Sequence, residues 1–284
     1  MKTLEATKYF DRDIIKSCKE INGGDEISDL FPSDLARYYR VGVEAKHRRA
    51  LVEGYRNTSR WVNGDNNCDY PPGFKENDLD HVKELLGWLN VLSEESPNLI
   101  EEIAEGDSEE LNELRLMLAV HDIGETIAGD VTADSSPEFK ANYKKFEAKA
   151  GRRLIMLIHN FSVRSRLLAC LERFENKNKS DKLVQFGHLL DKLTAAIKVA
   201  EVIAPYNFYS NSSFKQKLAE IVNKSIGFPL EYSDNLAKLI SKQSRESIRE
   251  IIEHELFEKY QQIPDSRVQE TIQLAKEISP TFKL

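Results

Sequence analysis

Apolar residues recur every three or four positions over most of the chain, and strict alternation of apolar and polar residues is rare. This spacing collects apolar side chains on one face of an α-helix. Gly and Pro, which interrupt helices, number only 13 and 9 among 284 residues. The pattern therefore predicts an all-α protein, and the chain is long enough to bury a substantial core.

Two helices are expected to bring polar residues into that core. The segment DLDHVKELLGWLNVL starts at Asp78 and carries His81 on a stripe of apolar residues. Residues 111–122 include LRLMLAV, which is apolar nearly all round apart from its Arg, so we expect a central helix. That helix ends in the adjacent pair His121 and Asp122. Buried charge is costly unless it is paired or binds an ion.

The remaining segments complete a helical chain. A long helix is expected over 181–204; it contains Asp191 and stops before Pro205, because proline cannot extend the backbone hydrogen-bond ladder. Residues 93–110 are expected to form an acidic connector. Further helices are expected at 33–56, 138–159, 163–176 and in the C-terminal part, and a loop at 64–77.

Charge and cysteine content narrow the class of protein. The net charge is −7, with 47 acidic against 40 basic residues, so nucleic acid and anionic membranes are not expected partners. No stretch approaches 18 uncharged apolar residues, and the first residues carry acids where a signal peptide has an apolar core. Three scattered cysteines without a C-x-x-C pair indicate reduced thiols. We expect a cytoplasmic protein that acts on a small molecule.

Four residues form a candidate metal site, each from an inward or border position of an expected helix. Two imidazoles and two carboxylates suit one divalent ion such as Mn, Fe, Co, Ni, Zn or Mg. A lone His on an apolar stripe is more often a core residue, and a His-Asp pair alone is weak evidence. Their place after an apolar run, with a further Asp on a later helix, favours a metal site. The candidate ligands are His81, His121, Asp122 and Asp191.

Two more acids follow the His-Asp pair closely. Glu125 lies four residues after His121, so it shares the face of that residue if the helix continues by one turn. Its carboxylate could accept a proton from water that the ion activates. Asp130 follows Gly129 and could point back at the same pocket. Both are therefore candidate catalytic residues.

These motifs resemble a known family. His81, His121-Asp122 and Asp191 resemble the H…HD…D signature of the HD-domain metal-dependent phosphohydrolases. HDIGETIAGDVT resembles the HD-x-x-E-x-x-x-G-D stretch of the 5′-deoxynucleotidase branch. RNTSRWV at 56–62 is similar to the Arg-Trp element of that branch, and RFENKNKSDKLVQFGHLLDKL resembles its approach to the last Asp.

The resemblance implies a fold and an activity. It implies an all-α HD-domain helical bundle, whose catalytic core would cover 36–205. The first 35 and the last 80 residues lie outside the resemblance, and there we expect a helical extension at 1–35 and additional C-terminal helices at 206–284 that pack on the core. The resemblance also implies removal of phosphate from nucleoside 5′-monophosphates, especially deoxyribonucleotides, and suggests a homodimer.

The family also implies a role for each site residue. The four ligands named above would hold one divalent ion. Glu125 would position or deprotonate the attacking water, and Asp130 would orient the water or the leaving group. Arg60 would bind the phosphate, for which guanidinium is well suited, and Trp61 would shape the sugar side of the pocket.

Three alternatives stay open at this point. HDIGET also resembles the HD-x-x-E-D motif of guanosine tetraphosphate hydrolases, although Thr126 replaces the final Asp. A non-catalytic HD-like module could bind a metal or nucleotide, but would not need Glu125 and Asp130. A two-metal site through His159 and His188 is disfavoured, because His188 lies only three residues before Asp191.

Overall fold

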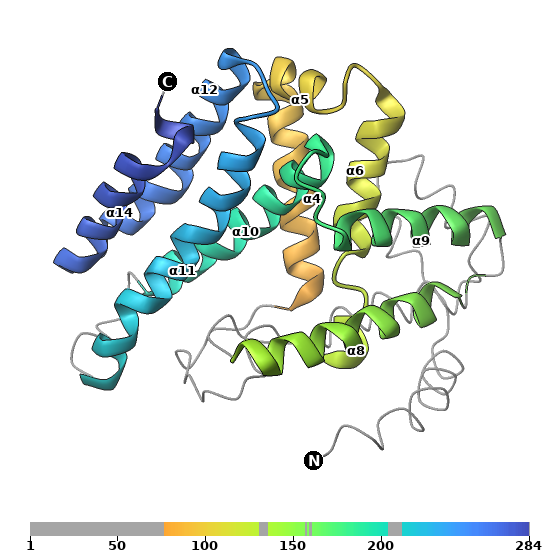
Figure 1. Cartoon of the computed structure of the whole chain (residues 1–284), viewed down its shortest axis with the longest axis horizontal. Helices are drawn as coiled ribbons and strands as arrows, with labels where there is room; N and C mark the ends of the chain where they lie inside the picture. The colour runs from red at the N-terminus through yellow and green to blue at the C-terminus, as the bar shows by residue number, and fades with distance from the viewer. Residues whose placement is uncertain (1–76, 131–135, 157, 159–160, 204–211, 284) are drawn as a thin grey trace. The chain divides into compact units, whose positions relative to one another are not determined.

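The structure is a computed structural model in which every regular element of the described part is a helix (Figure 1). This confirms the predicted all-α class. None of the described helices is both long enough and apolar enough to cross a membrane. Arg60, Trp61 and the predicted extension at 1–35 lie outside the described residues, which are 77–130, 136–156, 158, 161–203 and 212–283.

The helices follow one another with short connections. The first half comprises α4 (Asp78–Glu95), α5 (Pro97–Ile103), α6 (Ser108–Val120), α7 (Glu125–Ala128), α8 (Pro137–Met156) and α9 (Phe161–Glu175). The second half comprises α10 (Lys182–Ile203), α11 (Ser212–Leu236), α12 (Lys242–Ile251), the π-helix η3 (Ile252–Phe257), α13 (Glu258–Gln261), α14 (Ser266–Ile278) and the 3₁₀ helix η4 (Pro280–Phe282).

The chain forms two compact units, whose boundary passes through α4, α6 and α9. Among the described residues, the first unit contains the start of α4 as far as Lys83 and the segment Ala119–Glu172. The second unit contains Glu84–Leu118 and everything from Arg173 onward. The predicted domain limits at 35/36 and 205/206 stay a prediction.

Most helix positions agree with the sequence pattern. The helix predicted from Asp78 begins there, and the helix predicted at 181–204 is α10. The acidic connector at 93–110 is wrong as a continuous loop, since α5 lies inside it with Pro97 in its first turn. Pro lacks a backbone N–H and is well tolerated at a helix start, so the polar residues around it do not prevent a helix.

Helix α10 is the most deeply buried helix segment of the second unit. All eight residues from Leu183 to Leu190 are buried, which explains its apolar character on every side. Gly187 allows close packing here, because a Cβ at this position would lie 2.8 Å from the ring of Phe174. Figure 1 shows α11 running beside α10, and α11 also packs against α14.

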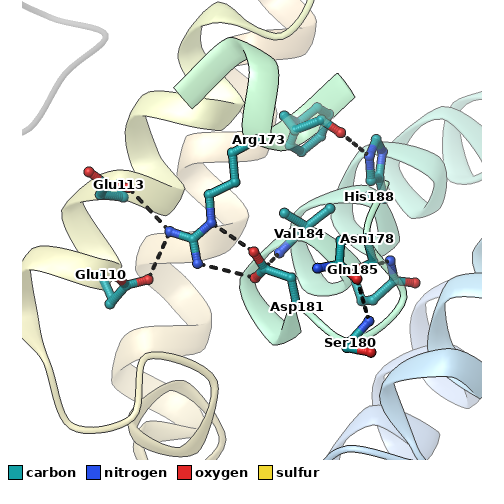
Figure 2. Close-up of polar contacts among 10 residues, drawn as sticks. Glu110, Glu113, Arg173, Asn178, Ser180, Asp181, Val184, Gln185 and His188 are labelled. Carbon is teal, nitrogen blue, oxygen red and sulfur yellow. Dashed lines mark hydrogen bonds and ion pairs between the residues drawn. The ribbon is translucent and has the colours of Figure 1, made fainter. Parts of the chain in front are cut away.

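A charged cluster anchors the start of α10 (Figure 2). The guanidinium of Arg173 donates to both carboxylate oxygens of Asp181, at 2.7 and 3.2 Å, and to Glu110 and Glu113 of α6 at 3.0 and 3.2 Å. Asp181 in turn accepts a hydrogen bond from the backbone N–H of Val184, as an N-cap residue does. We call these four charged residues, Glu110, Glu113, Arg173 and Asp181, the Arg173 cluster.

The C-terminal helices pack within the same unit. Helices α12, η3 and α13 form one continuous helical run, in which the fully buried Tyr260 donates its hydroxyl to the carbonyl of Ala196 at 3.0 Å. Glu102 of α5 accepts hydrogen bonds from the hydroxyl groups of Ser241 and Ser244 at the start of α12. These polar contacts tie the C-terminal helices to α5 and α10.

Candidate metal centre

The first histidine of the site lies one turn into α4. Asn77 caps the helix, because its side-chain oxygen accepts the backbone N–H of Asp80 at 3.0 Å. The next inward position is His81, which is 1% exposed. The helix start therefore fixes where this imidazole enters the interior.

The second histidine and the first aspartate lie in a turn rather than in a helix. Helix α6 ends at Val120, and the N–H of Ile123 bonds the carbonyl of Val120 at 3.1 Å. His121 and Asp122 therefore leave the helix geometry while remaining buried. A turn lets two adjacent side chains reach the same point more easily than a regular helix, where neighbours diverge by about 100°.

The three side chains converge in the first unit. His121 Nε2 lies 3.0 Å from Asp122 Oδ2, and His81 Nε2 lies 3.9 Å from the same oxygen. One ligand atom from each of the three lies within 4.8 Å of the others. Two imidazole nitrogens and a carboxylate oxygen are a donor set that first-row divalent ions bind. These residues therefore fit a metal ion.

Asp191, the fourth predicted ligand, is a buried residue of α10 in the second unit. Its Oδ2 forms an ion pair with Lys192 Nζ at a distance of 2.7 Å, and the residue is 4% exposed. A carboxylate buried this deeply requires a positive partner. Its place in the metal centre remains a prediction.

Glu125 lies close to the three converging residues. It begins the short helix α7, and its N–H bonds the carbonyl of Asp122 at 2.8 Å. The side chain is 5% exposed, and Oε2 accepts no hydrogen bond from the described residues. Helix α7 ends at Ala128, and its C-cap is Gly129, whose φ of 83° suits glycine. Asp130 follows and is also buried.

Helix α8 adds two residues that the sequence analysis did not single out. Glu147 is 8% exposed, and it forms with Asp122 and Glu125 a second group whose oxygens lie within 4.8 Å of one another. Lys144 Nζ lies 2.7 Å from Glu147 and 3.8 Å from Glu125. We call these four residues, Asp122, Glu125, Lys144 and Glu147, the Lys144 cluster.

Gly124 explains why α7 and α8 can approach each other here. A Cβ at this position would lie 2.2 Å from the backbone carbonyl oxygen of Glu147, which is an impossible distance. Any larger residue would push α8 away from the turn. Glycine at 124 is thus what brings Glu147 beside Glu125.

Burial sets the electrostatics of this cluster. It raises the pKa of Glu125 well above its usual value, and the charges of Asp122 and Asp130 raise it further, while Lys144 opposes them. Burial also raises the pKa of Glu147, against the effect of Lys144. A carboxyl group with a raised pKa is the kind that can accept and release a proton near neutral pH.

His188, which the two-metal alternative would use, is held by contacts within the second unit. It lies in the second unit, where its Nε2–H donates to the carbonyl of Phe174 at 3.0 Å (Figure 2), and its ring stacks on Tyr232. Burial lowers the pKa of His188 to about 3, so the ring stays neutral. It has the contacts of a core residue, and His159 lies outside the described residues.

The chain was compared with known protein families, curated proteins and solved structures. Residues 99–226 match the family model of the HD domain. The match supports the HD-domain superfamily. HD domains bind divalent metals and are in general metal-dependent phosphohydrolases. Neither the curated proteins nor the solved structures include a significant match to the chain.

The range matched by the HD-domain model contains several of the predicted site residues. It includes His121, Asp122, Glu125, Asp130 and Asp191, and it begins after His81. The helical structure is consistent with an all-α HD-domain bundle.

Proposed function

We propose that the protein is a metal-dependent phosphohydrolase that removes phosphate from nucleoside 5′-monophosphates, deoxyribonucleotides in particular. The observation that carries the proposal is the convergence of His81, His121 and Asp122 beside the buried carboxylate of Glu125. A binding module would need the three ligands but not a buried acid next to them with an oxygen that accepts no hydrogen bond from the described residues. Chemistry on a bound water explains that acid.

Each residue has a distinct part in this proposal. His81, His121 and Asp122 would hold a divalent ion, with Asp191 as the proposed fourth ligand. The ion would supply Lewis acidity toward phosphoryl oxygens and lower the pKa of an attacking water. Glu125 Oε2 would accept the proton of the attacking water, since it is buried and accepts no hydrogen bond from the described residues. Asp130 lies five residues on and would orient the water or the leaving group.

Aromatic side chains on α8 support a nucleoside as the group that carries the phosphate. The rings of Phe139 and Tyr143 stack with centroids 5.7 Å apart, and Phe146 follows on the same face. Burial raises the pKa of Tyr143 to about 12, and the charges of Glu125 and Asp130 add to this. The aromatic row therefore lies beside the acids, where it offers flat surfaces on which a base can stack.

The first test is phosphate release from a panel of 5′-deoxyribonucleotides and ribonucleotides. The protein is stripped with EDTA and assayed with and without Mn²⁺, Co²⁺ or Mg²⁺. We expect release from deoxynucleoside monophosphates that depends on added metal. Hydrolysis of guanosine tetraphosphate and of no nucleoside monophosphate would mean that the proposed substrate is wrong. Bound metal without any turnover would favour a binding module.

The place of Asp191 is tested separately by Asp191→Asn, with Asp181→Asn at the N-cap of the same helix as the matched control. If Asp191 is a ligand, its variant should bind Mn²⁺ at least about tenfold more weakly and lose turnover, as loss of one ligand does. The control should keep both metal and activity. Unchanged Mn²⁺ affinity in Asp191→Asn would remove this residue from the site.

A further inference from the structure

Lys144 has an unusual environment for a lysine on the exposed side of a helix. Its side chain is 65% exposed, yet its ammonium group lies against two buried glutamates. Nζ lies 2.7 Å from each carboxylate oxygen of Glu147 and 3.8 Å from Glu125 Oε1. A long lysine stem normally carries its charge outward, so this inward direction indicates a specific attraction.

The attraction comes from a place that is built for a cation. Asp122, Glu125 and Glu147 all present oxygens within 4.8 Å of one another, and all three residues are buried. Oxygen-rich, compact groups of this kind bind hard divalent ions. Glu125 Oε2 also has no hydrogen-bond donor among the described residues. Three buried carboxylates without a positive partner would be strongly unfavourable.

Asp122 belongs to two groups at once. It completes the proposed centre with His81 and His121, and it is also a member of the Lys144 cluster. A carboxylate has two oxygens and can bridge two cations. The arrangement therefore provides for one metal ion on the histidine side and a second cation on the glutamate side.

We propose that the ammonium group of Lys144 is that second cation, and that it restricts the centre to one metal ion. The inference rests on the proposed metal centre, but not on the identity of the substrate. Desolvation disfavours the charge of Lys144, but Glu147, Glu125 and Asp122 outweigh it and raise its pKa, so the group stays protonated. An ammonium supplies charge and three hydrogen-bond donors without Lewis acidity. Lys144 is thus a positioning residue that holds Glu125 and Glu147 in place.

The test is the metal stoichiometry of Lys144→Met, with Lys145→Met as the matched control at the next, exposed position of α8. Each protein is stripped and titrated with Mn²⁺, and bound metal is measured by mass spectrometry. We expect one ion in the wild type and in Lys145→Met, and two in Lys144→Met, where the second ion binds at least about tenfold more tightly than in the wild type. The paired ions should give a spin-coupled Mn²⁺ EPR spectrum.

Two more variants make the result decisive. Lys144→Arg keeps the charge and should bind one ion. Lys144→Met with Glu147→Gln removes one ligand of the second place and should return to one ion. Together they separate the loss of a cation from a general change in the fold.

Each outcome decides between the proposals. Two ions in the wild type would show that Lys144 swings away from the acids, and would overturn this inference while keeping the metal centre. One ion in Lys144→Met would also overturn it. No bound metal in any of the proteins would instead refute the proposed centre formed by His81 and His121.

Discussion

Two regions of the molecule each place one basic side chain among three carboxylates, and the surroundings make them different. In the Arg173 cluster the partners come from α6 and from the start of α10, and their side chains are 17–35% exposed. Arginine has a planar set of five donors, and three acids share them in well-formed hydrogen bonds (Figure 2). The carboxylates are also partly exposed to water, so the role of this cluster is to stabilise the packing of α6 against the start of α10.

The Lys144 cluster also combines one basic side chain with three acids, but its glutamates are buried and not all of their oxygens accept hydrogen bonds within the described part of the chain. Glu125 and Glu147 are buried, and their pKa values are raised because burial penalises their charged forms. A single ammonium approaches them from one side, and one oxygen of Glu125 accepts no hydrogen bond from the described residues. Charge that is buried at a net cost in stability is typical of a functional site.

The largest difference should appear in activity. Glu125→Gln keeps the shape of the side chain but removes its ability to accept a proton, so phosphate release should fall by about 10³-fold. Mn²⁺ binding should stay within about threefold of the wild type, since His81, His121 and Asp122 remain. The measurement is kcat together with metal content. If the variant loses its metal as well, Glu125 is a ligand rather than a base.

Acid should have opposite effects on the core residue His188 and on the two glutamates of the Lys144 cluster. His188 has a pKa of about 3 in the folded protein and about 6.5 in the unfolded chain, so the unfolded chain binds a proton first as pH falls. Its contribution to stability is present above pH 6.5 and is lost between 6.5 and 3, by about 2 kcal/mol from pH 7 to 5. Glu125 and Glu147 take up protons more easily when folded, so without metal they oppose this loss.

The contribution of His188 is isolated by His188→Gln. Glutamine can still donate to the carbonyl of Phe174, but it does not titrate. Urea unfolding in EDTA at pH 7 and pH 5 should show a free energy of unfolding that falls less in the variant than in the wild type. An equal fall in both proteins would mean that His188 is accessible to protons in the folded state.

The Arg173 cluster should matter for stability alone. Arg173→Met removes the cation but keeps much of the apolar stem, and it leaves three carboxylates close together. We expect the free energy of unfolding to fall by about 1–2 kcal/mol, with kcat unchanged at saturating metal. The matched control is Arg152→Met, whose ion pair with Glu172 is exposed and should contribute almost nothing. A loss of kcat in Arg173→Met would mean that this cluster also shapes the site.

Most of the fold and the two histidines of the metal centre could be predicted from the sequence. Helices α4, α6 and α10 are visible in the sequence because each has an apolar pattern, and His81 and His121 interrupt such patterns at recognisable places. Helix α5 was missed because its short apolar part lies among acids. Arg60 and Trp61 lie outside the described residues, so their roles stay predictions.

The α8 residues could not be identified in the same way. Glu147 falls on the stripe of Phe139, Tyr143 and Ala150, and a Glu on such a stripe was the signal that could have revealed it. Lys144 gives no signal, since it is one of several lysines on a basic helix. Its role depends on the approach of α7 and α8 at Gly124, and that approach is a property of the tertiary structure.

The smallest expected effect is the change in the free energy of unfolding when one carboxylate of each cluster is replaced by an amide, and this change should differ in sign between the clusters. Glu147→Gln replaces a carboxylate whose charge is disfavoured by burial, which raises its pKa, so in EDTA the free energy of unfolding should rise slightly. Asp181→Asn removes charge from a carboxylate that accepts two hydrogen bonds from Arg173 and caps α10, so the free energy of unfolding should fall by about 1 kcal/mol. Urea unfolding of the wild type and of both variants at pH 7 measures these two changes in the free energy of unfolding. A fall in both would mean that the ion pair of Glu147 with Lys144 outweighs the cost of burial, and that the two clusters differ in position but not in energetic character.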